Sequence, residues 1–336
     1  MRPWRRAASA AIALSALALA LSAEPASAGP EDQPFTFAVI GDIPYGDAQV
    51  AEFPKVVAQI NADPDVQLVG HLGDIKSGSS VCSDEYVQLI RSEFDKFKDP
   101  LVYTPGDNEW TDCHRPSAGP YNPLERLAAI RRVFFPRPGW TLGQDSVRVA
   151  SGVGYPENVT YRRAGVAFAA VHIVGSNNGM APWTGNTAPT PEQAAEVKGR
   201  TAAAVQSIHD TFDKARRNHN KAVALLTQAD MFDPTITDPA FADYDAFQPI
   251  VRTIAEESAR FSGPVYLFNG DSHAYNSDKP LDTGSKWLSF YGIRTAAPNL
   301  SRVTVDGSGN GTNYLKVTVH PGSEQVLTWT RVPFAF

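Results

Sequence analysis

The stretch Leu101-Val-Tyr-Thr-Pro-Gly-Asp-Asn-Glu-Trp-Thr-Asp-Cys-His114 begins as a short β-run and breaks into a polar turn. Pro105-Gly106 ends the run, and the turn that follows carries Asp107, Asn108 and Glu109. Acidic and amide side chains are poor core material, and α/β proteins carry their chemistry on turns at strand ends. The stretch therefore predicts a strand of an α/β sheet with a functional turn at its carboxyl end.

Three further apolar runs end in the same Gly-Asp pair. They are Phe37-Ala-Val-Ile-Gly-Asp42, Val69-Gly-His-Leu-Gly-Asp74 and Val265-Tyr-Leu-Phe-Asn-Gly-Asp-Ser-His273. Glycine lets the backbone turn sharply, so each Asp is expected to project from the edge of a sheet. One such pair after a strand is weak evidence, whereas four in one chain form a pattern that predicts converging strand ends.

Apolar residues at helical spacing separate these runs through the first part of the chain. Ser83 is a predicted N-cap, and Asn122-Pro123-Leu124-Glu125 is a predicted capping box with proline at the first helical position. Strands that alternate with helices in this way predict parallel strands covered by helices. The same alternation returns at residues 222–268, where two strands flank a helix.

The middle and the tail of the chain have other patterns. Residues 158–175 predict a β-hairpin with its break at Arg163-Ala-Gly165, and residues 175–191 form a long loop of a kind that is functional or disordered. Thr190-Pro191-Glu192-Gln193 opens a long helix that is expected to run to about His219. The tail, residues 299–336, predicts three antiparallel β-runs.

The first residues are typical of an export signal. Positive charges at Arg2, Arg5 and Arg6 precede an Ala/Leu run, and Ala26-Ser27-Ala28 fits a cleavage site. We expect residues 1–28 to be a signal peptide, residues 29–336 to form a single domain, and the destination to be the periplasm, the cell surface or the medium. An uncleaved anchor is the alternative. No other apolar run is long enough to span a bilayer.

Composition narrows the function classes. Removing the three arginines and Glu24 from the 30 basic and 36 acidic residues leaves 27 and 35, hence a net charge of −8 over 308 residues. This acidity argues against a nucleic-acid surface protein, and the length allows one large core. A monomer is expected. Because the chain is expected to be exported, Cys82 and Cys113 are predicted to form a disulfide, the alternatives being free thiols or an intermolecular pair.

The order of these motifs resembles that of the calcineurin-like metallophosphoesterases. That family has Asp-x-His, Gly-Asp, Gly-Asn-His-Asp/Glu, a lone His after a strand, and Gly-His-x-His. The corresponding stretches here are Gly41-Asp42-Ile43-Pro44, Gly73-Asp74, Gly106-Asp107-Asn108-Glu109, Gln228 and Gly270-Asp271-Ser272-His273. The resemblance implies an α/β fold, a four-layer αββα sandwich of two mixed β-sheets flanked by helices.

The resemblance also implies one or two divalent metal ions and a small phosphorylated substrate. By position, the first ion would bind Asp42, Asp74 and His273. The second would bind Asp74, Asp107, Gln228 and Asp271, so that Asp74 would bridge both. A metal-activated hydroxide would then hydrolyse a phosphate mono- or diester.

Several ligands depart from the family pattern. Pro44, Asp107, Gln228 and Asp271 replace family ligands, and Asn108 replaces the His that protonates the leaving group. A one-residue shift would instead place Asn108 at the ligand position. The retained oxygen donors suit Mn²⁺, Mg²⁺ or Ca²⁺ rather than Zn²⁺, and the identity of the ion stays open among Mn, Mg, Ca, Fe and Zn.

The replaced Asn-His pair leaves two functions open. Catalytic candidates are Asn108 itself, with Glu109 or His114 supplying the missing acid. The alternative is a family member that binds a metal or a phosphorylated ligand without turnover. Tyr45 and Trp183 flank the motifs and either line a pocket or pack within loops.

Overall fold

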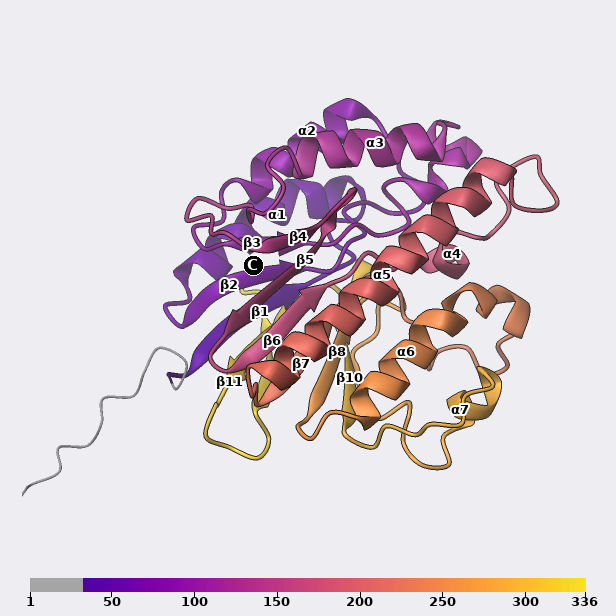
Figure 1. Ribbon diagram of the computed structural model, residues 1–336. Coiled ribbons are helices and arrows are strands. Elements are labelled where there is room, and N and C mark those ends of the chain that lie inside the picture. Colours follow the sequence, from indigo (N-terminus) through magenta and orange to yellow (C-terminus); the bar gives the residue numbers. More distant parts are fainter. Residues whose placement is uncertain (1–32) are drawn as a thin grey trace, which may run out of the picture.

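The computed structural model describes residues 33–336, so the predicted signal peptide lies outside the described residues. Two β-sheets face each other (Figure 1). The five-stranded sheet has the order β12 (Leu327–Pro333), β11 (Asn313–Val319), β1 (Phe35–Ile40), β2 (Val66–His71) and β3 (Leu101–Tyr103). The seven-stranded sheet has the order β4 (Ala150–Gly152), β5 (Tyr155–Arg163), β6 (Val166–Ala170), β7 (Ala222–Leu226), β8 (Val265–Asn269), β10 (Leu300–Thr304) and β9 (Asn276–Asp278).

Helices cover the outer face of each sheet (Figure 1). On the five-stranded sheet, α1, α2 and α3 pack through one apolar cluster, and α5 and α6 pack on the seven-stranded sheet through another. The prediction of a four-layer αββα sandwich is confirmed. No helix within residues 33–336 has the length and apolar character needed to cross a membrane. The helices are α1 (Gly46–Ala62), α2 (Asp84–Phe94), α3 (Pro123–Phe134), α4 (Gly175–Asn178), α5 (Pro191–Arg217), α6 (Gln248–Ala259) and α7 (Lys286–Phe290).

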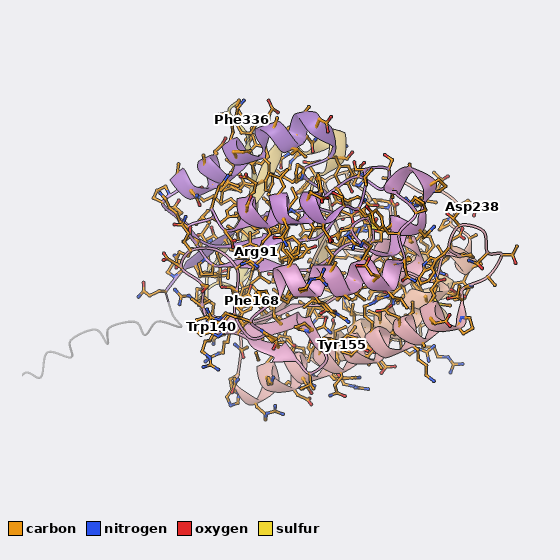
Figure 2. The ribbon with its side chains drawn as sticks, turned by 90° about the horizontal axis from the view of Figure 1, so that it is seen from above. Arg91, Trp140, Tyr155, Phe168, Asp238 and Phe336 are labelled. Atoms are coloured by element: carbon orange, nitrogen blue, oxygen red, sulfur yellow. A yellow bond between two sulfur atoms is a disulfide. The ribbon has the colours of Figure 1, made fainter. Side chains whose placement is uncertain are left out.

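A third apolar cluster fills the space between the two sheets. Phe37 of β1 stands edge-on to Phe168 of β6 and Phe268 of β8, with ring centroids 5.5 Å and 6.0 Å apart. Edge-to-face aromatic pairs are worth about 0.5–1.5 kcal/mol beyond the area that they bury. Phe168 lies well inside the molecule, beneath the helical layer (Figure 2). This core fixes the position of one sheet against the other.

Parallel pairing brings the strand ends of each sheet to one edge. β1 pairs parallel with β2, and β2 with β3, so Val39 lies opposite Gly70 and Gly70 opposite Val102. In the other sheet β6, β7 and β8 are parallel. The predicted hairpin is confirmed as the antiparallel pair β5–β6. The turns that follow β1, β2, β3, β7 and β8 carry the polar side chains singled out in the sequence.

The helix caps follow the sequence closely, with one exception. Ser83 accepts a hydrogen bond from the Tyr86 amide, and Thr190 with Gln193 forms a complete capping box. Asn122 caps α3 as expected, but Glu125 does not return the bond, because its carboxylate pairs with Arg126. The predicted capping box at Asn122 is therefore only an N-cap.

The predicted antiparallel tail is wrong in one strand. β11 and β12 are antiparallel to each other, and β11 is antiparallel to β1. β10, however, joins the other sheet and lies parallel to β8. The last three long strands are thus divided between the two sheets. The alternation of polar and apolar residues along a strand does not show which sheet the strand joins.

Cys82 and Cys113 form the predicted disulfide, with Cα atoms 5.9 Å apart. The bond joins the loop after β2 to the turn after β3, and both sulfur atoms are fully buried. A native disulfide contributes about 2–4 kcal/mol, mainly by restricting the unfolded chain.

We expect the double variant Cys82→Ser/Cys113→Ser to lose about 2–4 kcal/mol of unfolding free energy, measured by urea denaturation. A wild-type sample denatured with reductant present should show the same loss. Equal stability of the oxidised wild type and the variant would contradict this prediction.

Candidate metal centre

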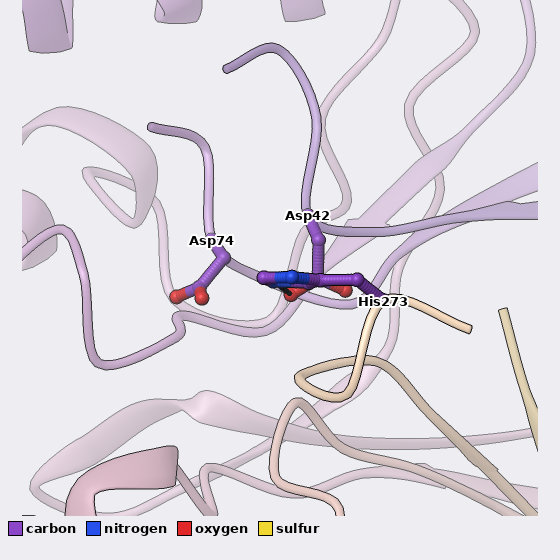
Figure 3. A group of neighbouring side chains, drawn as sticks. All are labelled: Asp42, Asp74 and His273. Carbon is purple, nitrogen blue, oxygen red and sulfur yellow. Dashed lines mark ion pairs between the residues drawn. The ribbon is translucent and has the colours of Figure 1, made fainter. Parts of the chain in front are cut away.

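Five predicted site residues converge in the structure. Asp42, Asp74 and Asp107 follow β1, β2 and β3, whereas Asp271 and His273 follow β8 of the other sheet. Two groups have ligand atoms within 4.8 Å of one another, namely Asp42 with Asp74 and His273, and Asp74 with Asp107 and Asp271. Figure 3 shows the first group, in which three separate segments bring the Asp42, Asp74 and His273 side chains to one place. Asp74 belongs to both groups, as the resemblance implies.

The backbone is strained at four of these residues. Asp42, Asp74, Asp271 and His273 have φ values of 54°, 52°, 72° and 61°. Residues other than glycine rarely adopt this left-handed conformation, and those that do cluster at functional sites. The strain therefore marks the same residues that the sequence pattern marks.

The glycines beside these aspartates matter mainly because they lack a side chain, and less because of their backbone freedom. The sequence predicted sharp turns at glycine, yet at Gly41-Asp42 and Gly270-Asp271 the aspartate has the positive φ. A Cβ on Gly106 would lie 2.0 Å from Asp74 Oδ1, and one on Gly270 would lie 2.1 Å from Asp42 Oδ2. These glycines are needed because a carboxylate from another strand end occupies the space beside them.

Protein donors hold Asp74 on both oxygens. Its Oδ2 accepts from Asn108 Nδ2 at 2.6 Å and from the Tyr45 hydroxyl at 2.9 Å, and its Oδ1 accepts from the Asn108 amide at 3.1 Å. Tyr45 therefore borders the site and does not merely pack within a loop. Asn108 presents its NH₂ group to the Asp74 carboxylate, so in this arrangement it acts as a hydrogen-bond donor to a proposed ligand. This geometry favours Asp107 over the one-residue shift.

Asp42 is held by the turn after β8. The Asp271 amide donates to both Asp42 oxygens, at 3.0 Å and 3.1 Å. His273 Nε2 lies 3.4 Å from Asp42 Oδ1. Burial lowers the pKa of His273, but the hydrogen bond and the charge of Asp42 outweigh it and raise that pKa. The two sheets are thus joined at the site by direct contacts.

The carboxylates repel one another. Burial, followed by the charges of Asp107, Glu109 and Asp42, raises the pKa of Asp74 well above its usual value. Burial, followed by Asp107 and Asp42, does the same for the pKa of Asp271. Carboxylates so close together bind protons or cations, because they cannot all remain charged and uncompensated.

The donor set fits a divalent cation. Asp107 Oδ1 is buried and has no hydrogen-bond partner, so this oxygen is free to act as a ligand. Each of the two groups offers three ligand atoms, and all but His273 donate carboxylate oxygen. Oxygen donors of this kind suit Mg²⁺, Mn²⁺ or Ca²⁺. Two ions would share Asp74.

Gln228 lies beside the centre but belongs to neither group. It is fully buried after β7, and its Oε1 accepts from the Gly175 amide at 2.7 Å. Its Nε2 has no partner, and an amide NH₂ does not ligate metals. The expectation that Gln228 completes the second metal site stays a prediction, and its observed contact supports the turn at Gly175.

The two candidates for the missing acid contact other groups. Glu109 is buried, and its Oε1 accepts from the Gly106 amide and the Tyr103 hydroxyl, both at 2.7 Å. His114 Nδ1 accepts from the Thr184 amide at 2.9 Å, on the loop that precedes α5. Glu109 therefore stabilises the turn after β3, and His114 anchors the loop. Asn108 alone among the three lies against a proposed ligand.

Four polar side chains near the centre escaped the sequence analysis. Lys76 is fully buried and donates to the Asn108 carbonyl at 2.6 Å. Ser176 Oγ lies 2.9 Å from Asp107 Oδ2 and 2.9 Å from Asp112 Oδ1. Burial, followed by Asp107, raises the pKa of Asp112 to about 8. For Asp112 the signal was available, since it lies in the same polar turn as Asp107.

Asp230 is the fourth of these side chains. It follows Gln228 by two residues, is buried, and forms an ion pair with Arg302 at 2.5 Å. Its Oδ2 also accepts from Ser272 Oγ at 2.8 Å, within the motif that carries Asp271 and His273. Asp230 thus supports the turn after β8. Its position after a buried strand was the available signal.

A cleft of about 710 Å³ adjoins the centre. Gly175, Ser176 and Asp271 line its inner end, and Asp238 stands at its outer end on a loop at the edge of the molecule (Figure 2). Its lining includes no Lys, Arg or His, and contains the acids Asp230, Asp233, Asp238, Asp243, Asp245 and Asp271. A phosphate group in this cleft would therefore need metal cations to offset its charge.

Residues 35–176 match the family model of the calcineurin-like phosphoesterases. This segment is similar to that family over less than half of the chain. The matched segment contains Asp42, Asp74 and Asp107, whereas Gln228, Asp271 and His273 lie beyond it. The calcineurin-like phosphoesterase family is divalent-metal dependent, which agrees with the two groups of carboxylates. No curated protein matches the chain.

Three solved structures resemble the chain at low identity, each with a TM-score of 0.42. One is "GAP50 the anchor in the inner membrane complex of Plasmodium", at 8% identity, covering 90% of each chain. A purple acid phosphatase from yellow lupin seeds is 12% identical and covers 92% of this chain. A 5'-nucleotidase precursor from Thermus thermophilus is 10% identical and covers 90%. This chain spans 55% of the length of each of the latter two.

Proposed function

We propose that this protein is an exported, metal-dependent phosphoesterase that hydrolyses a small phosphate mono- or diester. The observation that carries the proposal is the pair of carboxylate groups that share Asp74. The family match over residues 35–176 supports it. The acidic cleft supports it too, because only bound cations would make that cleft receptive to phosphate.

Asp42, Asp74 and His273 would hold one ion, and Asp74, Asp107 and Asp271 the other. Such ions supply Lewis-acid stabilisation of a phosphoryl group and lower the pKa of bound water. Asn108 and Tyr45 keep the Asp74 carboxylate fixed in the orientation that faces both groups. A ligand held in one rotamer loses little freedom on binding.

The competing function is binding of a metal or a phosphorylated ligand without turnover. The arrangement around the missing acid favours it, since Asn108 carries no transferable proton and Glu109 contacts Tyr103 and Gly106 instead. An enzyme in which no group replaces the acid would cleave only esters with good leaving groups. The two candidates therefore differ in turnover and agree on metal binding.

Metal content and turnover separate these candidates. We expect purified protein to contain a divalent ion and to hydrolyse bis-p-nitrophenyl phosphate best with Mn²⁺, among Mn²⁺, Mg²⁺, Ca²⁺ and Zn²⁺. Bound metal with no hydrolysis would favour the binding protein. A protein that takes up none of these ions would contradict both.

We further propose that the chain leaves the cytoplasm and acts as a monomer. The basic and apolar pattern of residues 1–28 supports export, and so does the buried Cys82–Cys113 disulfide, since such bonds persist in oxidising compartments. We expect mass spectrometry of the exported protein to give the mass of a chain that begins at Gly29. Sedimentation should give a single species of monomer mass.

A further inference from the structure

The turn Gly175–Asn178, labelled α4 in Figure 1, has an unusual backbone. Ser176, Asn177 and Asn178 have φ values of 51°, 54° and 51°, and Gly179 follows with 80°. L-residues visit the left-handed region singly, because their Cβ crowds the following carbonyl. Three in succession are a strained segment, and such strain persists only when surrounding contacts enforce it.

Contacts on both sides enforce this turn. Asn178 is fully buried, and its Oδ1 and carbonyl oxygen accept from the Arg200 guanidinium of α5. Asn177 Nδ2 donates to the Ala242 carbonyl and to Asp245 Oδ1 across the cleft. The Gly175 amide donates to Gln228 Oε1. Gly175, Asn177 and Asn178 are therefore each held by hydrogen bonds to other parts of the chain.

Ser176 presents its hydroxyl to two carboxylates. Its Oγ lies 2.9 Å from Asp107 Oδ2 and 2.9 Å from Asp112 Oδ1. A hydroxyl has one proton, so it satisfies one of the two oxygens at a time. Within the described residues 33–336, the Ser176 hydroxyl is the side-chain donor that contacts Asp107 Oδ2. The other oxygen of Asp107, Oδ1, has no partner.

Asp107 thus differs from the other ligands. Asp74 is held by Asn108 and Tyr45, and Asp42 by the Asp271 amide. Close packing also limits Asp107, since a Cβ on Gly175 would lie 2.8 Å from its Oδ1. A donor on Oδ2 would leave Oδ1, which has no hydrogen-bond partner, available as the ligand atom of Asp107.

We propose that Ser176 is a positioning residue for the second metal site, and that the strained turn Gly175–Asn178 holds its hydroxyl against Asp107. The inference rests on the proposed metal binding and goes beyond it, because none of the motifs quoted from the sequence contains Ser176. Groups that hold a metal ligand in place are worth about 10- to 100-fold in metal affinity.

The variant Ser176→Gly tests this role. Glycine adopts the left-handed conformation without strain, so the turn should form as well as before and the melting temperature of metal-free protein should not fall. Calorimetric titration with Mn²⁺ should nevertheless show the second site weakened by about 10- to 100-fold. Asn177→Gly is the matched control, since its φ is equally positive and its side chain contacts Ala242 and Asp245, not Asp107 or Asp112.

Three results would overturn the inference, and they differ in whether they also contradict the proposed function. If wild type and Ser176→Gly bind Mn²⁺ at two sites with equal affinity, Ser176 does not position a ligand, while the proposed function stands. If wild-type protein binds no Mn²⁺, the proposed function and this inference fall together. Weakened binding in Asn177→Gly equal to that of Ser176→Gly would assign the effect to the turn as a whole and would also overturn it.

Discussion

Asp74→Ala is expected to abolish metal-dependent hydrolysis, lowering kcat/KM by more than about 100-fold. Loss of a residue that only hydrogen-bonds to a metal ligand can lower activity by up to about 100-fold, so loss of the ligand itself should cost more. Asp74 is the one residue common to both groups, so its removal takes a ligand from each ion. The change also leaves Asn108 Nδ2 and the Tyr45 hydroxyl without their shared acceptor.

The measurement is hydrolysis of bis-p-nitrophenyl phosphate with saturating Mn²⁺, together with circular dichroism to show that the variant is folded. Asp63→Asn is a suitable control. Asp63 pairs with Lys316 at 2.8 Å beyond the end of α1, and this variant should keep wild-type turnover. Activity of Asp74→Ala within a few-fold of wild type would refute the assignment of the catalytic centre.

Removing metal is expected to destabilise the protein at neutral pH and to leave it unaffected in acid. Burial and neighbouring carboxylates raise the folded-state pKa values of Asp74 and Asp271 above the ordinary 3.8. Their contribution to stability is therefore fully present below pH 3.8 and is lost as the pH rises through the folded-state values. Bound cations offset the same repulsion, and protonated carboxyls do not bind them.

Mn²⁺ at 100 times its dissociation constant should stabilise the protein by about 2.7 kcal/mol at pH 7. Thermal melts with Mn²⁺ or with EDTA, at pH values from 3.5 to about 8 across this titration range, would measure the difference. The gap between the two curves should close toward acid pH. A gap that stays constant across this range would show that Mn²⁺ binds somewhere other than these carboxylates.

Most of the candidate site could be predicted because its signal is local. An apolar run followed by Gly-Asp is visible in a few residues, and parallel strands carry such ends to one edge. Asp42, Asp74, Asp107, Asp271 and His273 were found in this way, and they converge. The alternation of strands and helices predicted parallel strands covered by helices, whereas the four-layer arrangement of two sheets followed from the resemblance to the calcineurin-like metallophosphoesterases. The Cys82–Cys113 bond was predicted because an exported chain with two cysteines is expected to pair them.

The rest depends on contacts between distant residues, which no short pattern records. Asp230 is fixed by Arg302, which is 72 residues away in the sequence. Ser176 reaches Asp107 only because Gln228 and Arg200 shape the turn that carries it. β10 has the composition of its neighbours in the tail, and it joins β8 through pairing that only the assembled sheet defines.

Each of the two groups takes two ligands from one sheet and one from the other. The bite of each group, the distance that its oxygens leave for an ion, is therefore set by how the sheets rest on each other. Phe37 lies five residues before Asp42, and Phe268 three before Asp271, and their rings meet in the core between the sheets. Mg²⁺ requires ligands at about 2.0–2.1 Å and Ca²⁺ at about 2.3–2.6 Å. Packing of the aromatic core therefore contributes to the choice of ion, although these residues do not contact it.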